Sequence, residues 1–138
     1  MIIYVDGIFD LFHRGHLESF KFIKEKYPNC KLYVGVISDN DAKSYKRSPI
    51  IFEEDRTEII RGIKYVDKVI FPAPLIITKS FLDDFTIDKV VHGFSNPEDE
   101  QKQKKLFEVP INLNMFEVIP YYDLISTTDI IEKTKKEY

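Results

Sequence analysis

Short apolar runs alternate with amphipathic segments along this chain, and short polar connections join them. Ile2–Val5 is the first apolar run, and from His16 to Tyr27 the apolar residues recur at helical spacing until Pro28. The pattern predicts further strands at Lys31–Ile37, Val66–Phe71, Lys89–His92 and Asn114–Ile119, and further helices over about 53–64, 78–85, 96–107 and 127–138. Such alternation builds βαβ units, so we expect an α/β fold: a doubly wound, five-stranded parallel sheet with helices on both faces. In the helix over 53–64, we expect Ile59, Ile60 and Ile63 to face the sheet.

Composition limits the classes of protein that this chain resembles. With 138 residues and 43% hydrophobic residues, the chain fits a single globular domain over 1–138. Its net charge of −3 disfavours a general nucleic-acid binder. A single cysteine, Cys30, rules out an internal disulfide framework and a multi-cysteine metal site. The sequence shows no membrane-spanning run and no signal-peptide pattern, so we expect a cytoplasmic protein.

Two histidines stand at the first strand-to-helix junction. The first strand ends at Asp6-Gly7, and His13-Arg14-Gly15-His16 opens the following helix. In a parallel α/β sheet, ligands bind beyond the carboxyl ends of the strands, and free N–H groups at a helix N-terminus attract anions. A lone histidine is more often a structural polar residue. Two histidines that flank a glycine at such a junction favour a phosphate site.

The amino-acid sequence of this segment is similar to a known motif. Asp6-Gly7-Ile8-Phe9-Asp10-Leu11-Phe12-His13-x-Gly15-His16 resembles the His-x-Gly-His motif of the nucleotidyltransferase superfamily, and above all its cytidylyltransferase branch, which includes the phosphocholine enzymes. The similarity runs over residues 2–92 and resumes at 125–129. The resemblance implies a Rossmann-like domain that transfers CMP from CTP to a phosphorylated alcohol and releases pyrophosphate.

The resemblance also implies roles for individual residues. It makes His13, His16 and Lys46 catalytic, with Lys46 bridging CTP and the substrate phosphate and with Lys43 or Arg47 as possible substitutes. The implied nucleotide contacts are Gly7, Ile8, Phe9, Asp10, Gly15, Asp39, Arg56, His92, Gly93, Ile125, Ser126 and Thr127. The implied substrate contacts are Asp10, Lys46, Leu75, His92, Tyr121 and Tyr122.

Each of three charged or titratable residues also has a structural alternative. Lys46 lies in a polar segment, where a lysine is usually only solvated. Arg56 places a positive charge in the first turn of its helix, where the helix dipole disfavours it, so helix stabilisation does not explain this residue. An ion pair with Glu53 or Glu54 is the structural alternative to a ligand contact. His92 ends a strand, where it could bond only to the backbone.

The chain departs from the family pattern at two positions. Tyr121 stands where the family carries an arginine that clamps the triphosphate, and Leu75 stands where the phosphocholine enzymes carry a tryptophan beside the trimethylammonium group. The hydroxyls of Ser126 and Thr127 remain, and either one could cap the last helix. We expect phosphocholine as the substrate narrowly ahead of phosphoethanolamine. Three alternatives stay open: glycerol 3-phosphate as the substrate, another nucleotidyltransferase activity, and a CTP-binding protein that has lost turnover.

Three further expectations concern metals, partners and membranes. We expect Mg²⁺ to arrive with CTP and not in a protein cage, because no carboxylate cluster has metal-ligand spacing. The resemblance implies a homodimer that pairs through Tyr65-Val66-Asp67 together with the histidine motif, although Asp67 could equally be the polar start of a strand. The membrane-sensing helix of many phosphocholine enzymes has no counterpart in this sequence, so we expect no regulation by lipid.

Overall fold

A five-stranded parallel sheet forms the centre of the molecule, with the strand order β3-β2-β1-β4-β5. The computed structural model describes residues 1–137, and Tyr138, the last residue of the predicted C-terminal helix, lies outside them. The strands are β1 (Ile2–Gly7), β2 (Lys31–Val36), β3 (Lys68–Ile70), β4 (Lys89–His92) and β5 (Phe116–Val118). The predicted fold class is therefore confirmed, and strand order reverses between β1 and β4, the position where such sheets bind ligands.

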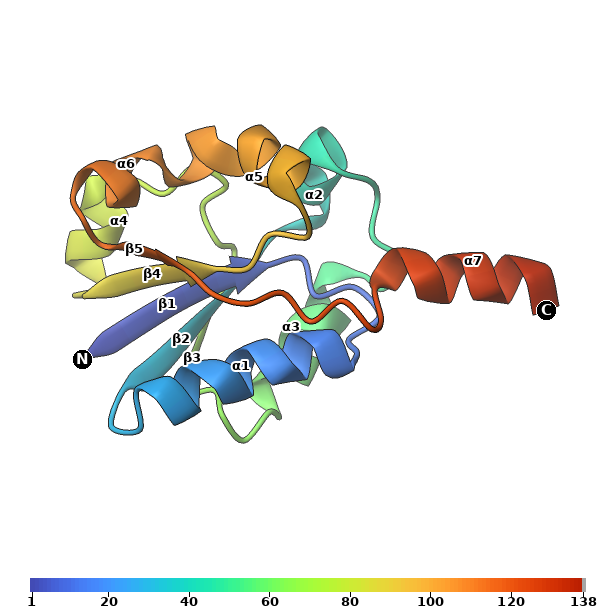
Figure 1. Ribbon diagram of the computed structural model, residues 1–138, viewed down its shortest axis with the longest axis horizontal. Coiled ribbons are helices and arrows are strands. Elements are labelled where there is room, and N and C mark those ends of the chain that lie inside the picture. The colour runs from blue at the N-terminus through green and yellow to red at the C-terminus, as the bar shows by residue number, and fades with distance from the viewer. Residues whose placement is uncertain (138) are drawn as a thin grey trace.

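Helices cover both faces of this sheet (Figure 1). The helices are α1 (Arg14–Lys26), α2 (Asp39–Tyr45), α3 (Glu53–Arg61), α4 (Lys79–Asp84), α5 (Pro97–Gln103), α6 (Glu108–Asn112) and α7 (Thr127–Glu137), with a 3-10 turn η1 (Lys104–Phe107) after α5. On one face lie α1 and α3; on the other lie α4, η1 and α6.

Alternate residues of β1 supply the two cores. Ile3 and Val5 pack against Phe20 of α1, while Tyr4 points to the opposite face and packs with Leu82 and Phe107. Successive side chains of a strand point to opposite faces, and both faces of this strand are covered. Burying each such large apolar side chain contributes about 1.5–3 kcal/mol, so β1 is held firmly where its carboxyl end meets the functional residues.

The structure contains two helices that were not predicted and changes the predicted buried face of α3. Helices α2 and α6 were not predicted, because each is a single short element with one buried residue, Ala42 and Pro110 respectively, and hence no periodic apolar face. Ile59 was predicted to face the sheet, which is wrong: it is 44% exposed. The buried face of α3 instead runs through Arg56, Thr57 and Ile60.

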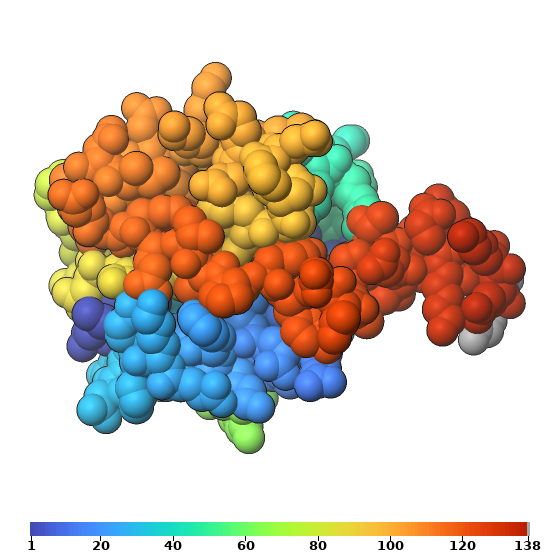
Figure 2. Space-filling view, viewed as in Figure 1, coloured from blue at the N-terminus to red at the C-terminus, as the bar shows by residue number. Residues whose placement is uncertain are grey.

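The C-terminal helix stands away from the sheet. Figure 2 shows α7 projecting from the rounded body, and it contains no fully buried residue. The segment that leads into it, residues 119–126, crosses the surface between α1 and α5. It therefore joins the two helical layers at the end of the sheet where β1 and β4 stop. No helix within residues 1–137 combines the length and apolar character needed to cross a membrane.

Candidate active site

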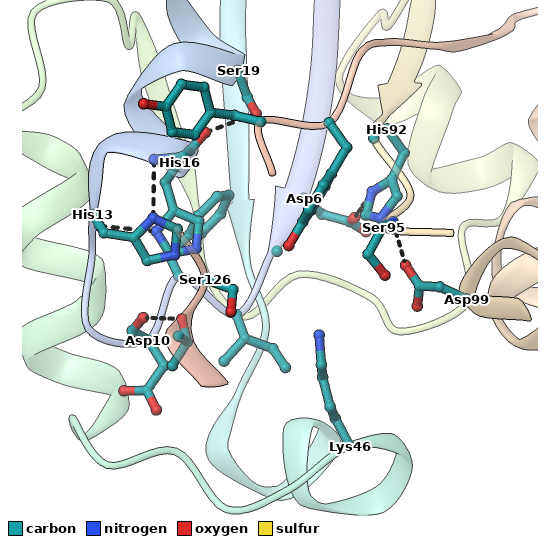
Figure 3. Close-up of a pocket in the computed structure, with 18 of the residues that line it drawn as sticks. Asp6, Asp10, His13, His16, Ser19, Lys46, His92, Ser95, Asp99 and Ser126 are labelled. Carbon is teal, nitrogen blue, oxygen red and sulfur yellow. Dashed lines mark hydrogen bonds and ion pairs between the residues drawn. The ribbon is translucent and has the colours of Figure 1, made fainter. Parts of the chain in front are cut away.

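A cavity of about 390 Å³ opens at the carboxyl ends of β1 and β4. Figure 3 shows side chains from α1, from the end of α2, from β4 and from the C-terminal segment converging on it. Its lining consists of Val5, Asp6, Gly7, Ile8, Phe9, Asp10, His13, Gly15, His16, Ser19, Phe20, Tyr45, Lys46, Arg47, Pro49, His92, Gly93, Ser95, Asp99, Gln103, Ile119, Tyr121, Tyr122, Ser126, Thr127 and Thr128. Most residues predicted for the site therefore lie together around one cavity.

His13 and His16 are fixed by the start of α1. His13 is the N-cap residue, and its Nδ1 accepts a hydrogen bond from the Gly15 N–H at 2.9 Å. The His13 N–H in turn donates to Nδ1 of His16 at 3.1 Å, and the two rings stack with centroids 3.9 Å apart. Because each Nδ1 accepts a hydrogen bond, the proton of each neutral imidazole sits on Nε2. Two ring N–H donors are thereby oriented before any ligand arrives.

Both histidines are neutral at physiological pH. Burial, together with the charges of His13 and Lys46, lowers the pKa of His16 to about 3. Burial also lowers the pKa of His13. The pair therefore contributes hydrogen-bond donors to the cavity and no formal positive charge.

The glycine of the motif makes room for this arrangement. A Cβ atom at Gly15 would lie 2.7 Å from Cε1 of His13, closer than two such carbons can approach. Any larger residue would therefore push the His13 ring out of its capping position. Gly7 likewise leaves space for the ring of Phe9, whose φ of 55° lies in the left-handed region.

Asp10 ties three segments together at the rim of the cavity. Its two carboxylate oxygens accept hydrogen bonds from the N–H groups of Ile50 and Ile51 at 2.8 and 2.9 Å. Its main-chain carbonyl accepts a hydrogen bond from the Thr127 hydroxyl at 2.8 Å. Asp10 is 5% exposed, so its observed role is to position the first loop, the α2–α3 loop and the start of α7.

Arg56 and Asp39, both predicted to contact nucleotide, lie outside the lining. The Arg56 side chain is fully buried and donates to Asp39 Oδ1 at 2.7 Å, to the carbonyl of Ile51 and to the carbonyl of Ile8. The alternative for Arg56, an ion pair with Glu53 or Glu54, is wrong, since the partner is Asp39. Arg56 is thus buried while the Asp39 side chain is 33% exposed, and their pair connects the loops next to the cavity.

The cationic residues near the end of α2 separate into two groups. Lys46 is the C-cap residue of α2, and its side chain points into the cavity (Figure 3). Arg47 also lines the cavity, whereas Lys43 is exposed and does not line it. Of the predicted substitutes for Lys46, only Arg47 therefore has access to a ligand.

Two carboxyl groups, those of Asp6 and Asp99, line the end of the cavity that lies across from His13 and His16. Burial raises the pKa of Asp6 to about 7 and lowers that of His92 to about 4, and their nearest atoms are 3.7 Å apart. Burial would raise the pKa of Asp99, but hydrogen bonds from Gln103 and the Ser95 N–H outweigh it and lower the pKa. Asp99 is therefore a carboxylate, and this end of the cavity suits a positively charged group.

Sequence reasoning missed several members of this end. Asp6 is the second-last residue of β1, a position at the carboxyl end of a strand that could have suggested a site residue. Asp99 lies in the first turn of α5. An acidic residue there is also explained by the helix dipole, so the sequence around Asp99 did not indicate a role in the site. Further lining residues absent from the predicted set include Ser19, Tyr45, Ser95 and Gln103.

The C-terminal segment closes the cavity. Tyr121, Tyr122, Ser126 and Thr127 line it, while Ile125 and Leu75 do not. Ser126 accepts a hydrogen bond from the Asp129 N–H at 3.1 Å, which confirms the predicted cap of the last helix. Leu75, predicted to stand beside the substrate, instead lies partly buried in the connection between β3 and α4.

Comparison with known proteins agrees with this geometry. A sequence model of the family described as "Cytidylyltransferase-like" matches residues 4–133, nearly the whole chain. The chain belongs to the cytidylyltransferase-like family. This family match spans both the histidine motif and the C-terminal segment that closes the cavity.

Several relatives of this cytidylyltransferase-like chain are curated enzymes. It is 35% identical to choline-phosphate cytidylyltransferase 2 of Arabidopsis thaliana, over 99% of this chain and 45% of the relative. It is 34% identical to choline-phosphate cytidylyltransferase A of Rattus norvegicus, over 99% of this chain and 37% of the relative. It is also 34% identical to ethanolamine-phosphate cytidylyltransferase of Arabidopsis thaliana, over 96% of this chain and 32% of the relative. The chain thus spans less than half the length of these relatives.

A solved structure supports the fold. The lipopolysaccharide core biosynthesis protein from Thermoplasma volcanium GSS1 superposes with a TM-score of 0.69 at 24% identity, over 89% of this chain and 98% of that chain. Within residues 1–137, no three or more His, Cys, Asp or Glu side chains group in a way that could hold a metal ion.

Proposed function

We propose that this cytidylyltransferase-like protein transfers CMP from CTP to a phosphorylated amino alcohol, releasing pyrophosphate, as a step in phospholipid precursor synthesis in the cytoplasm. The observation that carries the proposal is the pair of Nε2–H donors of His13 and His16, held at the N-terminus of α1 beside the cavity. Such preorganised donors favour a reaction in which charge builds on phosphate oxygens. The names of the curated relatives describe the same reaction class.

The reaction needs no general base at the nucleophile. A phosphate oxygen of the amino-alcohol phosphate, already an anion, attacks the α-phosphorus of CTP and forms a new P–O bond. The bond from the α-phosphorus to the bridging oxygen breaks, and its electron pair leaves with pyrophosphate. His13 and His16 donate hydrogen bonds as this negative charge grows, and Lys46, which points into the same cavity, holds the two phosphate groups together.

Mg²⁺ enters this scheme as part of the Mg–CTP substrate. The phosphate oxygens of a nucleotide and water supply most ligands of such an ion, so a dedicated protein cage is not required. We therefore expect activity to depend on Mg²⁺ and to be lost in excess EDTA.

The acidic end of the cavity supports an amino alcohol as acceptor. The Asp99 carboxylate lies across the cavity from the histidines, and Asp6 lies nearby (Figure 3). A cationic ammonium gains from the Asp99 carboxylate, whereas the neutral glycerol of glycerol 3-phosphate does not. Among amino alcohols we propose phosphocholine first, because the rings of Tyr45, Tyr121 and Tyr122 line the cavity and aromatic faces attract quaternary ammonium groups.

We also propose that the protein acts as a homodimer. Phe52 and Ile59, at the start and on the outer side of α3, are 68% and 44% exposed, an apolar surface that a second copy would cover. The Asp67 carboxylate in the predicted contact segment already accepts hydrogen bonds from Lys24 and Leu32, so the contact would rest on its neighbours Tyr65 and Val66. Sedimentation that shows a monomer at micromolar concentration would contradict the dimer.

A pyrophosphate-release assay tests the proposed function. CTP is supplied with phosphocholine, phosphoethanolamine or glycerol 3-phosphate, and we expect release with the amino-alcohol phosphates and the highest kcat/KM with phosphocholine. A tenfold preference for phosphoethanolamine, about 1.4 kcal/mol, would reverse the order of the two. Tight binding of CTP with no release on any acceptor would instead favour a nucleotide-binding protein without turnover.

A further inference from the structure

We propose that Arg47 binds the β- and γ-phosphates of CTP and supplies the positive charge that Tyr121 cannot. This assignment rests on the function proposed above, since it names the residue that holds the leaving group of that reaction.

The cavity needs a second cation. A triphosphate carries several negative charges, but both motif histidines are neutral. Only Lys46 and Arg47 of the lining residues carry a permanent positive charge. Arg56, a third cation nearby, is fully buried in its pair with Asp39 outside the lining. Without Arg47, a single lysine would face the whole triphosphate.

The Arg47 side chain is placed to bind an anion. Its Nη1 donates to the Thr128 hydroxyl at 3.3 Å, which holds the guanidinium at the first turn of α7. Over residues 1–137, no carboxylate oxygen lies within 4.0 Å of its nitrogens, so no internal ion pair neutralises its charge. A guanidinium offers several further N–H donors in a planar fork that matches phosphate oxygens.

The direction of nucleophilic attack indicates which phosphates of CTP Arg47 contacts. Figure 3 shows Ser126, which caps α7, on one side of Lys46 and the Asp99 carboxylate on the other. If the ammonium of the acceptor lies toward Asp99, its phosphate attacks from that side. The leaving pyrophosphate departs in line with the attack, toward Arg47 and α7. Arg47 therefore stabilises charge that develops on the leaving group.

Calorimetric titration tests this assignment without relying on turnover. Mg–CTP, CMP and pyrophosphate are titrated into the wild-type protein, into Arg47→Ala and into Lys43→Ala, which removes an exposed lysine of the same segment outside the cavity. We expect Arg47→Ala to weaken CTP and pyrophosphate binding at least tenfold and to leave CMP binding within twofold, while Lys43→Ala changes none of the three. Adding Tyr121→Arg to Arg47→Ala should recover most of the lost CTP affinity.

The outcomes separate the assignment from the function. Equal weakening of CTP and CMP, or no weakening of CTP, in a folded Arg47→Ala variant would overturn the role of Arg47 while leaving the proposed function intact. No binding of CTP by the wild-type protein would overturn the proposed function, and the assignment with it. Circular dichroism of each variant establishes that it is folded.

Discussion

The main-chain N–H of His13 donates to Nδ1 of His16 at 3.1 Å, so the backbone that begins α1 also fixes the tautomer of the second histidine. The Gly15 N–H does the same for His13. Helix capping and orientation of the ligand-binding donors are therefore one arrangement in this protein. A substitution that removes a ring loses a cap contact together with the proposed hydrogen-bond donor to phosphate.

His16→Ala should lower kcat roughly a hundredfold or more, the scale that is lost with one preorganised charge-stabilising donor. The fold should survive, because His13 still caps α1 through the Gly15 N–H. Steady-state kinetics with circular dichroism measures both effects. Near-normal turnover in a folded variant would remove His16 from the catalytic residues.

Lys46→Ala should raise KM for CTP and for the phosphorylated alcohol and lower kcat, because one charge is proposed to hold both phosphates. Lys43→Ala is the matched control and should change neither constant, since Lys43 does not line the cavity. Initial-rate kinetics with each substrate varied in turn gives the answer. A change confined to CTP would show that Lys46 does not bridge the two substrates.

Arg56→Ala should destabilise the protein by about 3 kcal/mol, because it removes a fully buried guanidinium and leaves Asp39 Oδ1 and two main-chain carbonyls without its hydrogen bonds. Arg61→Ala is the control: its pair with Glu58 is exposed, and its loss should cost less than about 1 kcal/mol. Urea unfolding monitored by circular dichroism compares the two. Equal losses would mean that Arg56 does not brace the loops.

Stability should fall as the pH is lowered from about 6.5 toward 3, partly because of His16. Its pKa is about 3 in the folded protein and near the ordinary value of 6.5 in the unfolded chain. Between these values the unfolded chain binds a proton that the folded protein does not, so acid favours unfolding. The wild-type protein should therefore lose more stability between pH 7 and pH 5 than His16→Ala. Urea midpoints at both pH values test this, and equal losses would contradict it.

The sequence by itself determined the fold class and the identity of the donors at the first strand-to-helix junction. Apolar alternation in β1 and β2 and the helical spacing in α1 are local patterns, and they predict a parallel sheet whose strand ends meet at one edge. The motif around His13 and His16 is also local, because its spacing sets both the cap and the stacking of the rings.

Only the tertiary structure decided the functions of residues far apart in the chain. Arg56 was open between a ligand contact and an ion pair, and the pair with Asp39 depends on how α2 and α3 pack. Asp99 and Arg47 face one cavity from positions 52 residues apart (99 − 47) in the chain, an arrangement that no periodicity encodes. Local patterns report which face of an element is buried, whereas side-chain partners across elements are fixed by packing in three dimensions.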